Sequence, residues 1–241
     1  MLTPMSDGVR LPAGSSGRQE RAERILDVTA GLLLRHGYKR VTIDDVATGA
    51  GIGKGTIYLH WKTRETLFWA VLQRDAARLL EQILDQLAED PGLALPSQLM
   101  RAIFVEVARR PLVRALLLSD AEVLGALASD TAVAAAQREL GGNQNYLELL
   151  RQQHLLRPDL TVAAAGVILG GVMRGFFADQ DADVAVPLTE QADLLADVLH
   201  RSLEIEGEPP RDAVAALAGR VGELFTAIVT VQRSQLQRAY G

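Results

Sequence analysis

The chain has 241 residues, no cysteine and a formal net charge of −5 at pH 7, and 48% of its residues are hydrophobic. This composition is typical of a globular protein with room for two small domains, and nothing in it requires an oxidising compartment. With four histidines, no HExxH pattern and no G-x-S-x-G elbow, the sequence offers neither a metal site nor a catalytic nucleophile. We therefore expect a protein that is not an enzyme and needs no cofactor.

The first 17 residues are rich in Gly, Ser and Pro and lack a basic segment followed by an apolar one. They are therefore predicted to be a disordered arm rather than a signal peptide, and the protein is expected to be cytoplasmic. A helix is predicted from about Gln19 to His36, where Gly37 can adopt the left-handed conformation that ends it. Its apolar face repeats at three- and four-residue steps and comprises Ala22, Ile25, Leu26, Thr29, Leu32 and Leu33.

The most informative stretch runs from Val41 to Leu67, where two very short helical patterns flank a glycine-rich turn. Thr42 precedes the first pattern and Asp45 lies three residues later, so their side chains can satisfy free backbone N–H groups as a variant capping box. The pattern predicts a helix that begins at Ile43 and ends near Ala50.

After the turn, residues Lys54 to Trp61 again show helical spacing. Isolated helices shorter than roughly 12 to 15 residues are marginal in water, so both short helices must be held by neighbours. A helix-turn-helix motif has this arrangement: the first helix braces the second, whose N-terminal residues face the base edges of the major groove.

The glycines of the turn also invite a nucleotide-binding interpretation. A Walker A loop needs Gly, four further residues and then Gly-Lys-Ser/Thr. When Gly53-Lys54 is aligned with Gly-Lys, the first Gly position holds Thr48 and the Ser/Thr position holds Gly55. In a dinucleotide fingerprint the third glycine position holds Thr56, and no strand pattern precedes it. We reject both interpretations on spacing.

The motif resembles the N-terminal DNA-binding domain of TetR-type transcriptional regulators over roughly residues 19 to 70. Where the family usually carries Phe, this chain has Trp61, which is also a large aromatic residue. The resemblance depends on about a dozen spaced positions: Gly37-Tyr38, Thr42-Ile43, Val46-Ala47, Ala50-Gly51, Gly55-Thr56-Ile57-Tyr58, His60-Trp61-Lys62 and Glu65 with Leu67.

Geometry and resemblance together predict seven DNA-contacting residues. Thr42 caps the bracing helix and is expected near phosphate, because exposed helix N-termini attract anions. Lys54, Gly55 and Thr56 open the second helix, where Gly55 lets the backbone approach DNA and the two side chains can meet base edges or phosphate.

The resemblance implies that Tyr58, His60 and Lys62 contact the sugar-phosphate backbone. Backbone contacts position a protein and base contacts specify sequence. Loss of Tyr58 or Lys62 is therefore expected to weaken binding to all sites alike, and loss of Thr56 to change the preferred sequence.

Charge is unevenly distributed along the chain. Residues 10–74 contain eleven Lys or Arg and six Asp or Glu, a balance of +5, and the rest of the chain has a balance of −10. Basic residues at one end can neutralise phosphates, and the acidic remainder would keep the other part away from DNA. A chance fluctuation among solvated side chains remains the alternative.

The rest of the chain predicts helices throughout, so we expect an all-α protein. Three regions are predicted: a disordered arm over 1–17, a helix-turn-helix domain over 18–66, and a helical effector-binding and dimerisation domain over 67–241. The helical runs after the motif are 63–88, 95–109, 111–128, 130–156, 159–179, 188–206 and 210–238.

The run from Leu160 to Ala178 is almost long enough to suggest a membrane span, but Arg174 and several small residues interrupt it. We expect a buried helix and no membrane partner. Glycines in this run would permit a subunit contact or a cavity wall, with ordinary packing as the alternative. Two later apolar faces are candidates for a dimer interface or for core: Leu195, Val198, Leu199 and Leu203, and Val214, Leu217, Val221, Leu224, Phe225, Ile228 and Val231.

These observations and the resemblance predict a homodimeric transcriptional regulator that binds palindromic double-stranded DNA, more plausibly as a repressor. The resemblance of the second domain to the effector-binding domain of the family implies that a small-molecule effector releases it. A dimer doubles the contacts of one short reading helix, and an effector must bind two conformations unequally. The alternative function is a helical ligand- or partner-binding module that has lost DNA binding. Candidate effector-pocket residues, each of which can also be plain core or surface, are Phe104, Tyr146, His154, Met173, Arg174, Phe176 and Phe177.

Overall fold

The computed structural model describes residues 13–118, 120, 124, 125, 127, 143–178 and 186–240. Within these ranges the chain is helical and contains no β-strand, which confirms the predicted all-α class; one isolated bridge pairs Leu156 with Glu204. The helices are α1 (Ala13–His36), α2 (Ile43–Ala50), α3 (Lys54–His60), α4 (Arg64–Glu89), the 3-10 turn η1 (Pro91–Ala94), α5 (Pro96–Ala108), α6 (Pro111–Leu118), α9 (Asn143–Gln152), α10 (Val162–Ala178), α11 (Leu188–Leu203) and α12 (Arg211–Tyr240).

The helices near the N-terminus follow the sequence prediction with one difference. Helix α2 begins at Ile43 and ends at Ala50 as predicted. Helix α1 begins at Ala13, so it includes residues 13–17 of the expected arm, and residues 1–12 lie outside the described part of the chain. The stretches of the predicted helices 111–128 and 130–156 that fall between α6 and α9 lie mostly outside it as well.

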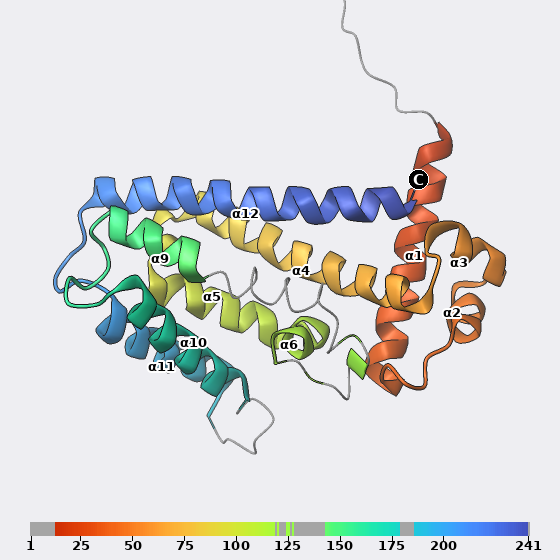
Figure 1. Cartoon of the computed structure of the whole chain (residues 1–241), viewed down its shortest axis with the longest axis horizontal. Helices are drawn as coiled ribbons and strands as arrows, with labels where there is room; N and C mark the ends of the chain where they lie inside the picture. The colour runs from red at the N-terminus through yellow and green to blue at the C-terminus, as the bar shows by residue number, and fades with distance from the viewer. Residues whose placement is uncertain are drawn as a thin grey trace, which may run out of the picture.

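Two apolar clusters form the interior, and helix α4 contributes to both. Its first turns, through Leu72, pack with α1, α2, α3 and α6, whereas its later turns, from Leu79, pack with α5 and α9 to α12. We call the part made by α1, α2, α3 and the first turns of α4 the head, and the rest the body. In Figure 1 the head lies at one end of the molecule, and α4 and α12 run side by side from it along the body.

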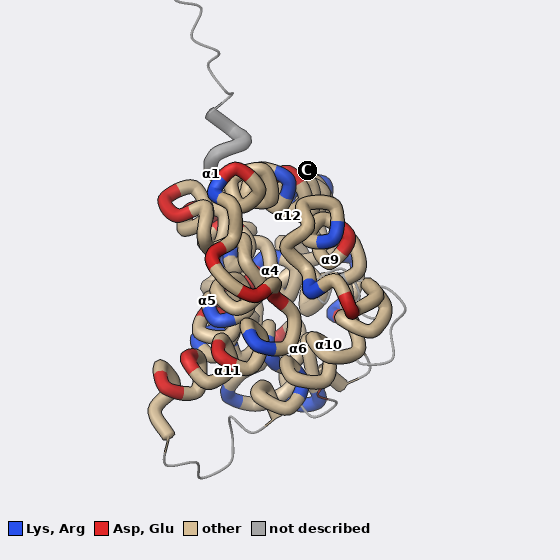
Figure 2. The backbone as a smooth tube through the Cα atoms, turned by 90° about the vertical axis from the view of Figure 1, so that its left-hand side faces the viewer, with Lys and Arg blue, Asp and Glu red and all other residues tan. Residues whose placement is uncertain are grey.

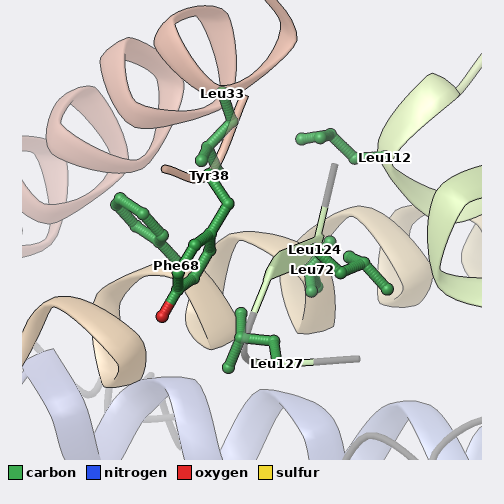
Figure 3. A pocket seen from close by; sticks show the side chains of 7 residues that line it. All are labelled: Leu33, Tyr38, Phe68, Leu72, Leu112, Leu124 and Leu127. Atoms are coloured by element: carbon green, nitrogen blue, oxygen red, sulfur yellow. The ribbon is translucent and has the colours of Figure 1, made fainter. Parts of the chain in front are cut away.

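A leucine-rich layer joins the head to the body. Figure 3 shows Tyr38 and Phe68 of the head facing leucines of α6 and of the segment after it. The layer leaves a cavity of only about 10 Å³, too small to admit more than a single water. Its lining residues are Leu33, Tyr38, Phe68, Leu72, Leu112, Leu124 and Leu127.

The apolar faces proposed for a dimer interface mostly belong to the core. The members buried in the body are Leu195, Leu199, Leu203, Leu217, Val221 and Phe225. Helix α10 was expected to be buried, but only one of its faces is: Leu169 is fully covered, whereas Val167 is 77% exposed. The exposed side of α10 is therefore a further candidate for a subunit contact, together with the members of the α11 face that stay exposed, such as Val198.

Among the described residues, Arg211–Arg238 of α12 is the stretch that is long and apolar enough to cross a membrane, and α10 is apolar but shorter. Length and composition alone are weak support for a membrane span, because core helices of soluble proteins meet the same criterion. In this fold α12 packs along α4, and Arg233 pairs with Glu81 at 2.7 and 2.6 Å.

Candidate nucleic-acid interface

The start of α2 is fixed by a capping box, as predicted. The backbone N–H of Asp45 donates to the Thr42 hydroxyl at 3.2 Å, and the backbone N–H and the hydroxyl of Thr42 donate to the Asp45 carboxylate at 2.8 and 2.7 Å. These hydrogen bonds hold the pKa of Asp45 below its usual range. The hydroxyl of Thr42 thus serves the cap, and an ionised carboxylate lies beside it.

The turn between α2 and α3 begins at Gly51, whose φ of +66° is in the left-handed region that favours glycine. Its N–H bonds to the carbonyls of Ala47 and Thr48, which ends α2. Where α2 crosses α1, a Cβ on Gly49 would lie 2.7 Å from Val28. The small residue therefore lets the bracing helix pack closely on α1.

Helix α3 has only seven residues and is held from below by its apolar face. Ile57 is fully buried and Trp61, at the C-cap, is 2% exposed, and both belong to the head cluster with Ile25 of α1. This packing stabilises α3, which is too short to be stable as an isolated helix.

Arg64 locks the segment before α2 to the start of α4. Its guanidinium lies 4.5 Å from the centroid of the Tyr38 ring and donates to the Val41 carbonyl at 3.3 Å. The Tyr38 hydroxyl in turn donates to Glu65 at 3.2 Å, and burial raises the pKa of Tyr38. In the sequence Arg64 counts only toward the basic charge of residues 10–74, and no local pattern indicates this role.

Six of the seven predicted contact residues are at least partly accessible around α3. Tyr58 is 43% exposed, and Thr56 is half-buried. The other four, Thr42, Lys54, Gly55 and Lys62, are exposed, and a Cβ on Gly55 would meet no atom within 4 Å. Leu59, which the sequence analysis did not select, is 67% exposed on the same short helix.

His60 does not join this surface. It is the last residue of α3 and is only 7% exposed, with its ring 5.3 Å from that of Trp61. The resemblance implies a backbone contact for both Tyr58 and His60, but residues two apart on a helix point in different directions. The structure therefore places His60 in the packing under the helix.

The two predicted lysines have defined local partners. Lys54 pairs with Asp44 of α2 at 2.5 Å, with roughly half or more of both side chains exposed. Lys62 donates to the carbonyl of Tyr58 at 3.5 Å. Both ammonium groups thus lie against α2 or α3, and the one on Lys54 is partly neutralised by a neighbouring carboxylate.

One of the basic residues counted toward the head's positive charge is not at the surface. Arg74 is 1% exposed and pairs with Asp27 at 2.8 Å and with Glu23 and Asp75 at 3.3 Å. Burial raises the pKa of Asp75. This cluster joins α1 to α4, and in it the single Arg74 charge is outnumbered by three carboxylates, so Arg74 adds no positive charge to the surface of the head.

Figure 2 views the molecule from the end opposite α2 and α3, and basic and acidic residues are interspersed along the helices there.

Comparison with known proteins gives a family for this arrangement. The family model for bacterial regulatory proteins of the tetR family matches residues 25–71, which are the second half of α1, α2, α3 and the start of α4. The HTH-type transcriptional regulator AcrR of Shigella flexneri is 27% identical over 183 residues, 69% of this chain and 83% of AcrR. The regulator AlkX of Mycobacterium tuberculosis is 32% identical over 127 residues, 51% of this chain and 60% of AlkX.

Among solved structures, the complex of SmeT with triclosan superimposes with a TM-score of 0.63 at 22% identity and covers 78% of this chain and 94% of SmeT. SmeT is the repressor of a Stenotrophomonas maltophilia multidrug efflux pump. At this identity the likeness concerns the fold. Because the fold and the head sequence agree with the same group of proteins, this chain belongs to the TetR family of DNA-binding transcriptional regulators.

Proposed function

We propose that the protein is a cytoplasmic, homodimeric repressor that binds a palindromic operator and leaves it when a small molecule binds the body. The observation that carries the proposal is the accessible side of α3, where Lys54, Gly55, Thr56 and Tyr58 lie beside Lys62 on a helix clamped by its buried face.

Each accessible residue suits one kind of DNA contact. Lys62 and the phenol of Tyr58 suit phosphate, which fixes register. Thr56 and Leu59 suit base edges, Leu59 through apolar contact with a thymine methyl group. Thr42, whose hydroxyl is engaged by Asp45, contributes through the position of α2 more than through its own oxygen.

The proposed dimer uses the surface of α10 and α11. Val167 of α10 and Leu194 and Val198 of α11 are 77%, 50% and 38% exposed, and the two helices pack against each other. Large apolar side chains exposed on neighbouring helices are typical of a protein-binding surface. Replacement of Val167 by Arg should give a monomer by light scattering, and a variant that remains dimeric would exclude α10 from the interface.

The proposed effector site is the aromatic part of the body core. The Phe104 ring lies 6.0 Å from that of Phe176 and 5.5 Å from that of Phe177, and Tyr146 and Met173 are buried in the same cluster. His154 and Arg174 are exposed, so they are not included. SmeT binds an apolar aromatic molecule, triclosan, which supports an apolar effector here.

The test is selection of bound sequences from a random pool of duplex DNA, followed by binding measurements at several salt concentrations. We expect an enriched palindrome with affinity that falls steeply as salt rises, because phosphate contacts release counterions. The matched control is Lys62→Met, which keeps the fold but should lose affinity for every sequence. If the wild-type protein enriches no sequence, the partner-binding module without DNA binding becomes the better hypothesis.

A further inference from the structure

The C-terminal end of α12 contacts the head, although it is more than 150 residues away from it in sequence. Leu236 is 2% exposed and belongs to the head cluster that includes Trp61 and Ala70. One turn earlier, the Arg233 guanidinium forms its two hydrogen bonds with Glu81 of α4. The side-chain amide of Gln235 accepts a hydrogen bond from Gln73 of α4.

The other end of the same helix is anchored in the body. Leu217 and Val221 are fully buried there and Phe225 is 9% exposed. A helix of 30 residues is about 45 Å long. One rigid element thus has its first half in one apolar cluster and its last turns in the other.

Helix α4 makes the same connection, because it carries residues of both clusters. The leucine-rich layer of α6 and the segment after it also joins the head to the body. Helix α12, packed side by side with α4 and fixed at both ends, adds resistance to bending of α4 and to rotation about its axis, so release of its last turns should loosen the head.

The docked end of α12 lies across a groove of about 330 Å³ from the end of α3, the helix that carries the proposed DNA-reading surface. The groove is lined by His60, Trp61, Lys62, Thr66, Trp69, Ala70, Gln73, Gln235 and Leu236. Displacement of Leu236 would remove one wall of this groove, whose other lining residues include Ala70 and the predicted phosphate contact Lys62.

We infer that Leu236 and Gln235 are positioning residues for DNA recognition: through them the last turns of α12 fix the orientation of the head relative to the body. The inference rests on the proposed dimer that reads a palindrome, because orientation of two heads sets the half-site spacing. If a loosened head adopts the competent orientation about one time in ten, the apparent dissociation constant rises about tenfold.

The experiment uses spin labels, which the absence of native cysteine makes specific. Cysteines are introduced at Thr48 of α2 and Glu190 of α11, both exposed, and labelled chains are diluted with unlabelled ones. Leu236→Asp is compared with Val231→Asp, since Val231 lies on the same helix but is 55% exposed. Leu236→Met is the conservative rescue, and a chain that stops after Val231 repeats the loss without adding a charge.

We expect a narrow head-to-body distance distribution for the wild-type protein, Val231→Asp and Leu236→Met, and a broad one for Leu236→Asp and the shortened chain. The same two variants should bind the selected operator about tenfold more weakly. They should also tolerate one-base-pair changes in half-site spacing that the wild-type protein rejects, which loss of stability alone would not produce.

Unchanged distances in both loosened variants would overturn the inference. So would broadened distances accompanied by unchanged operator affinity and spacing tolerance. If the wild-type protein binds no operator at all, the proposed function fails, and the distance distributions still decide whether α12 fixes the head.

Discussion

Arg74 of α4 donates to the Asp27 carboxylate of α1 at 2.8 Å, with 2% of the arginine side chain exposed. Glu23 and Asp75 complete the cluster at 3.3 Å. A guanidinium this deeply buried persists only when its charge and its N–H groups are matched. The cluster therefore holds α1 and α4 together within the head.

Replacement of Arg74 by Ala should lower the free energy of unfolding by about 3 kcal/mol, because it leaves Glu23 and Asp75 partly buried without their cation and opens a gap in the packing. Urea denaturation measures this loss. Arg78 is the matched control, since it also contacts Glu23, at 3.1 Å, but is 46% exposed. Arg78→Ala should cost less than about 1 kcal/mol; equal costs for the two variants would contradict the buried role of Arg74.

Lys62→Met should weaken binding to operator and random DNA by the same factor. One phosphate contact fewer should also reduce the slope of log affinity against log salt by about one for each subunit. Fluorescence anisotropy over a salt series measures both quantities. A change confined to the operator would instead make Lys62 a base-reading residue.

Asp44→Asn should strengthen DNA binding. The carboxylate of Asp44 pairs with Lys54 at 2.5 Å on the accessible side of α2 and α3, so it both neutralises a cation and repels phosphate. Removal of one exposed negative charge should raise affinity several-fold at low salt and less at high salt, because exposed charges are screened. Unaltered affinity at low salt would place Asp44 and Lys54 away from the DNA.

The parts of the head that local chemistry determines could be predicted from the sequence. The start of α2 depends on Thr42 and Asp45, which lie three residues apart, and its end depends on the adjacent Gly51. The burial of His60, which was predicted to contact DNA, could not be predicted, because it depends on where α3 ends and on the neighbouring Trp61. Arg74 looked like surface charge for a similar reason: its partners on α1 are 47 and 51 residues away.

Contacts between distant segments left no local signal at all. The hydrogen bond between Gln73 and Gln235 joins residues 162 apart, and the periodicity of α12 shows an apolar face without showing what covers it. That is why the sequence left Val221 and Phe225 as candidates for either a dimer interface or core, and the fold uses them as core.

The capping box at α2 should give stability a defined pH dependence. The folded pKa of Asp45 lies below its ordinary value of 3.8, so its stabilising effect is present above that value and is lost as pH falls through the folded pKa. Asp45→Asn lacks this titration. The difference in unfolding free energy between the wild-type protein and Asp45→Asn should therefore shrink as the solution is acidified below about pH 4, and a constant difference would exclude the carboxylate as the cause.

Gly125 packs against the Tyr38 ring at the joint between head and body. Its φ is +54°, and an added Cβ would lie 2.2 Å from Cδ1 of Tyr38. The ring has little room to move away, since the cavity beside it measures only about 10 Å³ (Figure 3). Gly125→Ala should therefore combine two costs: about 1 kcal/mol for a side chain at positive φ, and about 1 to 3 kcal/mol for the overlap.

Gly207 separates these two costs. Its φ is also positive, at +84°, but an added Cβ would meet nothing within 4 Å. In Gly207→Ala the free energy of unfolding should fall only by the cost of a side chain at positive φ. The additional fall in Gly125→Ala, measured by urea denaturation, then gives the cost of the overlap with Tyr38. The Arg64 guanidinium stacks on the Tyr38 ring and bonds to the segment before α2, so a shift of the ring should also disturb the head. Gly125→Ala should therefore lose DNA affinity as well, whereas Gly207→Ala should bind like the wild-type protein. Equal stability losses in the two variants would mean that the Tyr38 layer can yield, and the joint between head and body would then be softer than its packing indicates.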